Sequence, residues 1–428
     1  MEGESMSEWK EVRLGDIVTV KSGYAYKGKY ISNKGKNILL GMGCVSYNDK
    51  FLYSGARAYD EDCDERYCAK AGDIVLATRQ QSDSLPILAM PAIIPDSLFD
   101  KKIIVGTNLY LIKNDSDIDN HFLFWLLKTP NYVNYISSVK TGTTVRMVTK
   151  KDVENYIFKC PSKEERDTIS NILWGIDAKI ETNNKLNEKL EEMAQAIFKS
   201  WFVDFEPFKD KPFHETELGM IPERWEVVSL DELTSKFGTG LNPRKNFVLG
   251  HGNNYYVTIK NMNNNRIYLD EKCDKVDDEA LLKINARSKL KKGDLLFSGI
   301  GTIGRVAMVN EEPKNWNTSE SVFNMHPSEL CTSEFLYVLL LSDVFQKFVK
   351  MNALGAVQQG IRMASLKSYK IAIPGKKVML SFCSIIKPIV DYIQSNNEEN
   401  DRLASLRDTL LPRLMSGELI VSRLWMKR

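Results

Sequence analysis

The chain lacks the usual signs of a metal site, a disulfide scaffold or a membrane protein. Its seven cysteines are odd in number and none forms a C-x-x-C pair, and its four histidines lie far apart. This distribution argues against a structural zinc site and favours reduced thiols in the cytoplasm. No run of ~18 apolar residues occurs, and the N-terminal "MEGESMSEWKEVRL" has no apolar segment. The sequence therefore predicts neither a membrane span nor a signal peptide.

Familiar catalytic motifs are absent as well. The sequence has no H-E-x-x-H, no G-x-S-x-G and no Asn-Pro-Pro-aromatic motif of the kind that amino-methyltransferases use. A chain of 428 residues without a credible active site is more often a binding or scaffolding protein than an enzyme. Lys and Arg total 58 against 56 Asp and Glu. This balance neither requires nor excludes a nucleic-acid partner, so any basic surface must be local.

Two glycine-rich segments have the letters of nucleotide-binding motifs without the surroundings. "SGIGTIG" (298–304) spells G-x-G-x-x-G, but "RVAMV" follows it and predicts a strand where a dinucleotide loop needs a helix. "GYAYKGKY" (23–30) nearly matches a P-loop, but Tyr30 replaces the hydroxyl residue that would bind magnesium. We therefore expect no cofactor on this chain, and an enzyme using Gly299 to Gly304 is the weakest alternative.

What the chain does contain is an internal repeat. "WKEVRLGDI" from Trp9 returns as "WEVVSLDEL" from Trp225, and "AKAGDIVLATR" (69–79) returns as "LKKGDLLFSGI" (290–300). "HFLFWLL" (121–127) likewise returns as "EFLYVLL" (334–340). A solenoid repeats every ~20–50 residues, so this much longer period indicates two duplicated domains.

A long amphipathic helix is predicted after each copy, because apolar residues recur at spacings of three and four. Ser162 and Glu165 form a capping-box start for the first helix. Gly175 and Pro388 occupy equivalent places in the two copies, and both residue types weaken a helix. The pattern thus predicts a short helix, a break and a longer helix in each half, with the second half ending near Pro412.

Heptad positions suggest that the two helices pair. Asparagines fall at matching a and d positions of both helices, namely Asn183, Asn187, Asn396 and Asn400. A buried asparagine in such a seam costs stability but fixes register. We expect an antiparallel coiled coil with these four residues setting its register. The alternative is that each helix packs on its own globular neighbour with the asparagines exposed.

The fold class predicted is α+β, with two pseudo-repeated globular domains separated by the two long helices. The expected ranges are 1–161 and 209–374 for the globular domains, and 162–208 and 375–428 for the helical regions.

The chain resembles the specificity subunit of Type I restriction–modification systems. "WKEVRLGDIVTVKSG" and "WEVVSLDELTSKFGTG" look like the openings of its target-recognition domains, and "KKGDLLFSGIGTIGRVAMV" looks like its core strand and following loop. "AQAIFKSWFVDFEP" (194–207) and "NNEENDRLASLRDTLLPRLMSGEL" (396–419) look like its central and distal helical regions.

The resemblance implies a non-catalytic subunit of a methyltransferase and endonuclease complex. Each recognition domain would read one half of a split DNA sequence, and the helices would set the spacing. The implied partners are double-stranded DNA, two methyltransferase subunits and two restriction subunits, with no membrane. S-adenosylmethionine, ATP and magnesium would then be bound by the partners. A two-headed scaffold that binds only proteins is the main alternative.

Candidate DNA contacts are loop residues that could reach base edges or phosphates. For base edges they are Arg79, Gln80, Gln81, Thr143, Thr144 and Arg146 in the first domain, and Asn242, Arg244, Gln358, Gln359 and Arg362 in the second. For phosphate or shape contacts they are Tyr24, Tyr26, Lys27, Lys150, Lys151, Lys245, Lys260 and Arg305. The alternative for each is an ordinary solvated side chain.

Four aromatic residues crowd the end of the first long helix, namely Phe198, Trp201, Phe202 and Phe205. Aromatic anchors are common at protein interfaces, so we predict that part of this group meets a methyltransferase subunit. Burial against the second domain or the distal helix is an equal alternative.

Overall fold

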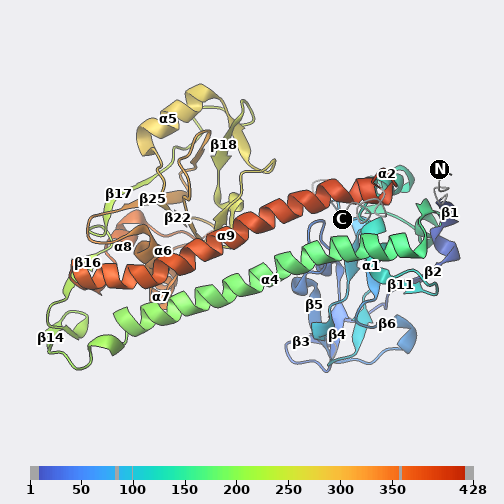
Figure 1. Cartoon of the computed structure of the whole chain (residues 1–428), viewed down its shortest axis with the longest axis horizontal. Coiled ribbons are helices and arrows are strands. Elements are labelled where there is room, and N and C mark those ends of the chain that lie inside the picture. Colours follow the sequence, from blue (N-terminus) through green and yellow to red (C-terminus); the bar gives the residue numbers. More distant parts are fainter. Residues whose placement is uncertain (1–8, 82–85, 99, 356–358, 420–428) are drawn as a thin grey trace, which may run out of the picture. The chain divides into compact units, whose positions relative to one another are not determined.

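The computed structural model describes residues 9–81, 86–98, 100–355 and 359–419. The chain divides into two compact units (Figure 1). Unit 1 combines Met1–Thr182 with Glu399–Arg428, and unit 2 spans Asn183–Glu398. The division falls inside both long helices, α4 (Lys163–Phe202) and α9 (Lys376–Met415), so each unit contains one half of each. No helix in the described ranges is long and apolar enough to cross a bilayer.

Unit 1 contains a four-stranded antiparallel sheet of order β2-β11-β7-β9 and a five-stranded mixed sheet of order β3-β5-β4-β10-β6. Two further strand pairs are β1-β13 and β8-β12. The strands are β1 (Lys10–Arg13), β2 (Val18–Ser22), β3 (Ile31–Ser32), β4 (Asn37–Leu40), β5 (Ala56–Tyr59), β6 (Cys68–Ala69), β7 (Ile74–Ala77), β8 (Arg79–Gln80), β9 (Pro91–Ile93), β10 (Ile103–Val105), β11 (Leu109–Asn114), β12 (Arg146–Met147) and β13 (Ile157–Cys160), and the short helices are α1 (Asn120–Leu126), α2 (Pro130–Val139) and α3 (Lys150–Glu154).

Unit 2 contains a four-stranded antiparallel sheet of order β17-β25-β22-β23 and a three-stranded sheet of order β21-β18-β24. The pairs β14-β15, β16-β26 and β19-β20 complete it. The strands are β14 (Phe213–Thr216), β15 (Gly219–Pro222), β16 (Glu226–Ser229), β17 (Thr234–Thr239), β18 (Asn254–Val257), β19 (Met262–Asn263), β20 (Arg266–Ile267), β21 (Asp274–Val276), β22 (Leu295–Ser298), β23 (Val306–Met308), β24 (Trp316–Thr318), β25 (Val322–Pro327) and β26 (Lys370–Ile373), and the short helices are α5 (Asp278–Ser288), α6 (Ser333–Leu341), α7 (Asp343–Met351) and α8 (Met363–Lys367).

The strand orders confirm the duplication. In chain order, the first, fourth, second and third strands lie side by side in both four-stranded sheets. The opening strand pairs with the closing strand in each copy, β1 with β13 and β16 with β26. A parallel pair also recurs, β4 with β10 and β18 with β24. The two units are therefore two versions of one topology.

The Gly-Asp turn before the central strand shows how the sequence builds both copies. Gly72 has φ 79° and Gly293 has φ 88°, conformations that glycine adopts without strain. The following aspartate then closes the turn, because Asp73 accepts the N–H of Lys70 at 2.9 Å and Asp294 accepts that of Lys291 at 2.9 Å.

Each long helix is continuous, so the predicted breaks at Gly175 and Pro388 are wrong. The capping box at the start of α4 is confirmed, since the Ser162 hydroxyl accepts the Glu165 N–H at 3.3 Å and the Glu165 carboxylate accepts the Ser162 N–H at 3.4 Å. Gly175 costs a helix only about 1 kcal/mol, and burial of the apolar stripe on both sides of these positions outweighs such local costs. The second helix also passes Pro412 and ends at Met415.

The helices pair in antiparallel fashion within each unit. In unit 1, Asp177 of α4 forms an ion pair with Arg407 of α9 at 2.8 Å, and Lys179 forms one with Glu399 at 3.1 Å. In unit 2, the Phe202 and Phe382 rings lie 4.8 Å apart. The predicted α+β fold with an antiparallel helix pair is confirmed.

All four asparagines of the predicted seam are buried, with exposed fractions of 1% for Asn183, 7% for Asn187, 4% for Asn396 and 6% for Asn400. Asn396 donates its amide to the Asn187 oxygen at 2.8 Å. Asn187 in turn donates to Asn397 at 3.0 Å. The alternative of exposed asparagines is therefore excluded, while their control of register stays a prediction.

The aromatic group at the end of α4 lies largely in the core of unit 2. Phe198 is 1% exposed and Phe202 is 5% exposed, and both pack against Phe335 and Phe382. For these two, the structure shows the alternative, burial within the second domain. Trp201 and Phe205 are half-buried, so the predicted partner interface can draw only on them.

Candidate nucleic-acid interface

The loops that carry most candidate DNA contacts gather at one edge of the four-stranded sheet in each unit. In unit 2 the ends of β17 and β22 lie beside the starts of β25 and β23, because neighbouring strands are antiparallel. We call the loops there loop cluster 2, comprising residues 240–246, 258–262, 299–305, 318–321 and 359–362. The corresponding loop cluster 1 of unit 1 comprises residues 23–27, 78–81, 106–108 and 141–147.

"SGIGTIG" is a turn between two strands. It connects β22 to β23, which pair from Leu295 with Met308 to Phe297 with Val306, so the predicted strand after the glycines is confirmed. The Ser298 hydroxyl donates to the Thr302 carbonyl at 2.6 Å and accepts the Arg305 N–H at 2.8 Å. These bonds close the loop on itself.

Backbone hydrogen bonds join this turn to the other loops of cluster 2. The Gly299 N–H donates to the Ser321 carbonyl at 2.9 Å, and the Gly301 N–H donates to the Gln359 carbonyl at 2.7 Å. The side chains of Gln359 and Arg362 are exposed beside it. Gln358, also a candidate, lies outside the described residues.

Arg305, a predicted phosphate contact, is half-buried and makes bonds within the protein. Its guanidinium donates to the carbonyl of Ile259 at 3.1 Å and to that of Met262. It therefore ties the glycine turn to the segment that presents the exposed Lys260. Arg305 thus helps to hold the cluster together, its contact with phosphate stays a prediction, and Lys260 points outward.

The 240–246 loop is fixed by a glutamate that sequence reasoning missed. Glu320 accepts the Asn242 amide at 2.8 Å and the Tyr256 hydroxyl at 3.0 Å. Arg244 and Lys245 follow and are exposed. Asn242 is thus half-buried and bound to Glu320, while Arg244 and Lys245 point outward.

Glu61 has the same role in unit 1 and was also missed. It accepts hydrogen bonds from Tyr59 at 2.8 Å and from Tyr24 at 3.1 Å, and it pairs with Lys27 at 3.3 Å. These bonds, led by that from Tyr59, lower the pKa of the Glu61 carboxyl. Tyr26 packs edge-on against Tyr59. Glu61 lies in the acidic run 60–65 and Glu320 stands between two serines, and no periodic pattern in either segment indicates which acid binds a tyrosine.

Neighbouring residues of β8 in loop cluster 1 point to opposite sides. Arg79 is exposed, whereas Gln80 is 6% exposed and its side-chain oxygen accepts the Leu88 N–H at 3.1 Å. The structure thus contradicts Gln80 as a reader of base edges, because its side chain faces the interior. Gln81 is exposed.

The remaining candidates of unit 1 are exposed or half-buried. β12 pairs with β8, which places Arg146 opposite Gln80, and the Arg146 guanidinium donates to the Gly142 carbonyl. Thr143 and Thr144 between them are exposed. Lys150 and Lys151 are exposed on the first turn of α3.

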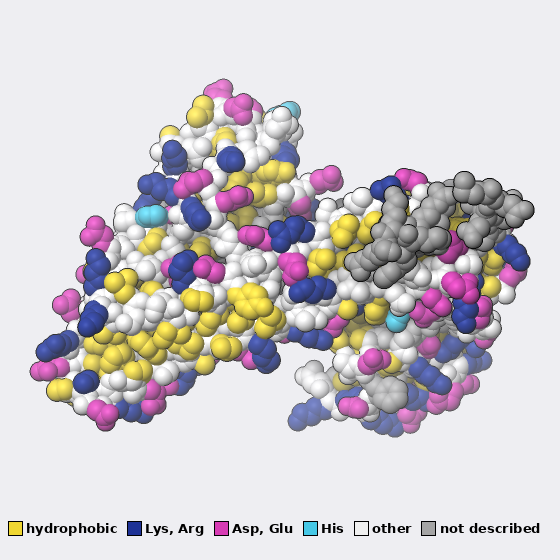
Figure 2. Space-filling view, viewed as in Figure 1, with side chains coloured by type: hydrophobic (Ala, Val, Ile, Leu, Met, Phe, Trp, Pro, Cys, Tyr) yellow, Lys and Arg dark blue, Asp and Glu magenta, His cyan; other side chains and the backbone are white. Residues whose placement is uncertain are grey.

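Several of these cations have no acidic partner within the described ranges. Arg79, Lys150, Lys151, Arg244, Lys245, Lys260 and Arg362 form no ion pair with a described carboxylate. Elsewhere acids and bases are interspersed on the face shown in Figure 2. In the part of the chain that the structure describes, no group of three or more His, Cys, Asp or Glu residues could hold a metal ion. Four of these unpaired cations, Arg244, Lys245, Lys260 and Arg362, lie in loop cluster 2, and Arg79 lies in loop cluster 1.

Comparison with known proteins identifies the class of protein to which this chain belongs. The family described as Type I restriction modification DNA specificity domain matches residues 6–192 and again residues 222–404. The chain is thus built from two DNA specificity domains. It belongs to the Type I restriction–modification specificity family, and the resemblance found in the sequence is confirmed. It is a specificity subunit, the non-catalytic component that recognises DNA sequence.

Relatives match over nearly the whole chain. The Type I restriction enzyme HindI specificity subunit of Haemophilus influenzae is 25% identical over 97% of this chain and 100% of its own length. The MjaIX specificity subunit of Methanocaldococcus jannaschii is 25% identical over 99% of this chain and 96% of its own. The crystal structure of a Type I S subunit from M. genitalium shares the fold, with TM-score 0.51, 14% identity and coverage of 97% and 98%.

Proposed function

We propose that this specificity subunit recognises a bipartite, asymmetric DNA sequence, with loop cluster 1 reading one half-site and loop cluster 2 the other. The observation that carries the proposal is that the two units share a strand order while their loop sequences differ. Both units present loops at the same edge of the same strand order, but the loop residues differ. Tyr24, Tyr26 and Lys27 stand where the second copy has residues such as Asn242 and Arg244.

The exposed side chains of the loop clusters are of the types that read base edges directly. Arg79 and Arg244 are exposed, and an arginine binds guanine with two hydrogen bonds in the major groove. Gln81 and Gln359 are also exposed and carry the amide that pairs with adenine. Lys245 and Lys260 would contact phosphates, which gives affinity that falls with salt.

The paired helices are proposed to set the spacing between the half-sites. Lengthening both helices by equal insertions would change the gap between the half-sites and leave the recognised bases unchanged. One turn of B-DNA is about 34–36 Å long and a helix rises about 1.5 Å per residue, so insertions of a few residues produce measurable changes.

A second part of the proposal is that the chain scaffolds two methyltransferase and two restriction subunits. The unit 2 halves of α4 and α9 expose large apolar side chains, with Met193 53%, Leu380 53%, Ile385 42% and Tyr392 51% exposed. Figure 2 shows hydrophobic side chains gathered over these helices. Exposed apolar patches of this kind mark protein interfaces. S-adenosylmethionine, ATP and magnesium would be supplied by those partners.

Mapping N6-methyladenine in a host genome by long-read sequencing tests the proposal. Replacing residues 240–246 and 359–362 with those of another specificity subunit should change one half of the methylated sequence and leave the other half intact. A change in both halves, or in neither, would contradict it. The protein-only scaffold predicts no salt-dependent affinity for duplex DNA when the methyltransferase subunit is present.

A further inference from the structure

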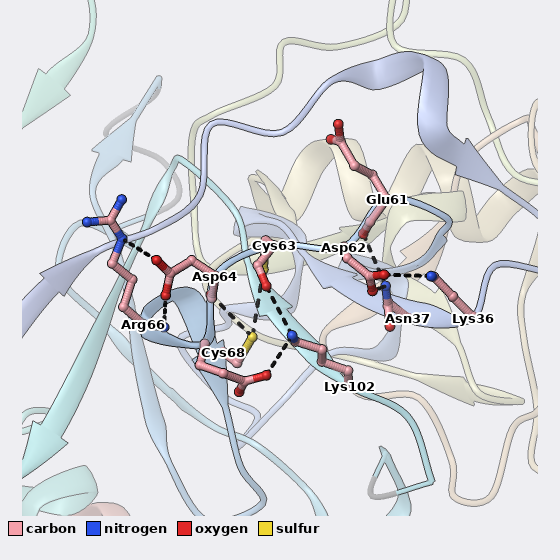
Figure 3. Close-up of polar contacts among 10 residues, drawn as sticks. Lys36, Asn37, Glu61, Asp62, Cys63, Asp64, Arg66, Cys68 and Lys102 are labelled. Atoms are coloured by element: carbon pink, nitrogen blue, oxygen red, sulfur yellow. Dashed lines mark hydrogen bonds and ion pairs between the residues drawn. The ribbon is translucent and has the colours of Figure 1, made fainter.

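Cys63 and Cys68 of unit 1 face each other across a short segment (Figure 3). Their sulfur atoms lie 3.7 Å apart. Both side chains are partly exposed, whereas the other five cysteines, at 44, 160, 273, 331 and 383, are buried. This pair is therefore the place where solvent-borne reagents can reach two thiols at once.

The backbone around the pair is held from several sides. The intervening 3-10 helix Glu65–Tyr67 is capped by Asp64, which accepts the Arg66 N–H at 3.0 Å. Cys68 begins β6 and pairs with Ile104 of β10. The Cys63 carbonyl accepts the Lys102 ammonium at 3.0 Å. The two cysteines are thus kept close without a covalent bond between them.

Closing a bond requires only a small movement. A disulfide has its sulfur atoms about 2.05 Å apart, so rotation of the two side chains must remove less than 2 Å. The Cys68 sulfur also lies 3.7 Å from the Asp64 carbonyl (Figure 3).

We propose that Cys63 and Cys68 form a reversible dithiol–disulfide site whose oxidant is a small disulfide such as oxidised glutathione. In the first step the Cys68 thiolate attacks one sulfur of the oxidant, and one glutathione thiolate leaves. In the second step the Cys63 sulfur loses its proton and attacks the Cys68 sulfur, which releases the second glutathione thiolate. Two protein thiols lose two electrons, and the oxidant becomes two thiols.

The order of the steps follows from the surroundings. Burial, together with the hydrogen bond to Cys68, raises the pKa of the Cys63 thiol, which makes Cys63 the poorer initial nucleophile. The Lys102 ammonium, which pairs with Glu65 at 2.7 Å, opposes the rise in the pKa of Cys63, and the Glu65 carboxylate adds to it. Cys68 therefore reacts first and Cys63 closes the bond.

The site lies beside the predicted DNA contacts of unit 1. Cys63 follows Glu61 by two residues and packs in one cluster with Tyr24 and Tyr26. The bond would close a covalent ring next to the carboxylate that holds Tyr24 and Lys27. The chemistry itself is independent of DNA recognition, so either proposal can fail without the other.

Incubating the folded full-length chain with oxidised glutathione, followed by peptide mass spectrometry, tests the site. The expected product is an internal disulfide in the peptide containing residues 63–68, with loss of two hydrogens and full recovery on reduction. Persistent mixed disulfides with glutathione on Cys63 or Cys68, or free thiols at both under conditions that oxidise other cysteines, would overturn the proposal.

Variants and a second probe sharpen the result. Cys63→Ser and Cys68→Ser should each abolish the internal bond, whereas Cys273→Ser, which removes a buried thiol elsewhere, should leave it unchanged. Phenylarsine oxide, which bridges two adjacent thiols, should bind the unmodified chain and protect the pair from oxidation. Binding that survives Cys68→Ser would show that the arsenical uses other thiols and would count against the site.

Discussion

The two Gly-Asp turns show what the duplication kept and what it changed. In unit 1, Asp73 pairs with Lys113 of β11 at 2.8 Å. In unit 2 the equivalent Asp294 pairs with His326 of β25. Burial raises the pKa of the Asp294 carboxyl. The backbone of the turn is dictated by glycine and aspartate and is the same in both units, whereas the partner of the aspartate is free to vary.

The helix pairs show the same freedom in the core. An offset of 213 residues relates Asp177 to Val390 and Arg407 to Ala194. Unit 1 therefore buries an ion pair where unit 2 buries two apolar side chains, which are 8% and 4% exposed. An apolar pair carries no buried charge, whereas an ion pair at the same place leaves one when either partner is removed. The differences between the units can be tested by replacing residues of one unit with their equivalents from the other.

The largest expected effect comes from the close backbone approach that both units share. A Cβ atom on Gly240 would lie 1.6 Å from the Thr318 carbonyl oxygen, and one on Gly23 would lie 2.1 Å from that of Gly106. Gly240→Ala and Gly23→Ala should each destabilise the chain by about 3 kcal/mol in denaturant unfolding. Gly28→Ala, with nothing within 4 Å, is the control. Equal stability of all three variants would refute the shared geometry.

Breaking the ion pair should have an effect of similar size. Arg407→Ala leaves the Asp177 carboxylate buried without its partner, at an expected cost of about 3 kcal/mol. The double variant Arg407→Ala with Asp177→Val installs the apolar pair of unit 2 and should regain most of that loss. Denaturant unfolding of both singles and the double measures the coupling. Additive losses would show that the two side chains are not coupled.

A buried lysine gives the third contrast. Lys128 is 9% exposed and donates to the carbonyls of Tyr47 at 2.9 Å and Asp49 at 3.0 Å. The equivalent residue in unit 2 is Leu341. Burial lowers the pKa of Lys128 from 10.5 to about 8. Between these two pH values the unfolded chain binds more protons than the folded chain, so stability rises with pH.

Lys128→Leu removes this dependence. Relative to the variant, the wild-type chain should gain roughly 3 kcal/mol of unfolding free energy across this pH range. Below pH 8 the difference between the two should be constant, because Lys128 is protonated in both states. Unfolding curves of the two proteins at several pH values give the difference directly. A difference that stays flat up to pH 10.5 would show that the ammonium is solvated.

The smallest expected effects concern DNA. Arg79→Ala should weaken discrimination at one half-site and Arg244→Ala at the other, each by about 2 kcal/mol or roughly thirtyfold in affinity. Binding of the complex with its methyltransferase to duplexes altered in one half-site measures this. Lys283→Ala, on α5 outside the loop clusters, should have no effect. If both variants act on the same half-site, the assignment of one unit to each half-site is wrong.

Periodic features of the fold could be predicted from the sequence. The spacing of apolar residues predicted both long helices, and Ser162 with Glu165 predicted the start of the first. The repeated Gly-Asp segments predicted the duplicated strands. The breaks at Gly175 and Pro388 were wrongly predicted, because local costs of about 1 kcal/mol for glycine and about 3 kcal/mol for proline are outweighed when helices of 40 residues pack along their length.

The loop sites were harder to predict from the sequence, because the directions of their side chains depend on contacts with residues distant in sequence. Arg79 and Gln80 are adjacent, and the alternation of a strand turns one outward and the other inward, a signal that was available. The bonds from Arg305 to the 259–262 segment, and those of Glu61 and Glu320 to their tyrosines, have no such pattern. These hydrogen bonds can form only once the fold has brought the loops together.

The sharing of both helices has a consequence for synthesis. The core of unit 1 includes Leu411 and Leu414, which are 7% and 1% exposed and pack in one cluster with Leu14 and Phe122. Domains usually fold in order as the chain leaves the ribosome, yet the first globular domain translated must wait for nearly the last helix turns to arrive. Chains truncated after residue 398 should therefore hold a complete second unit and an unfinished first one.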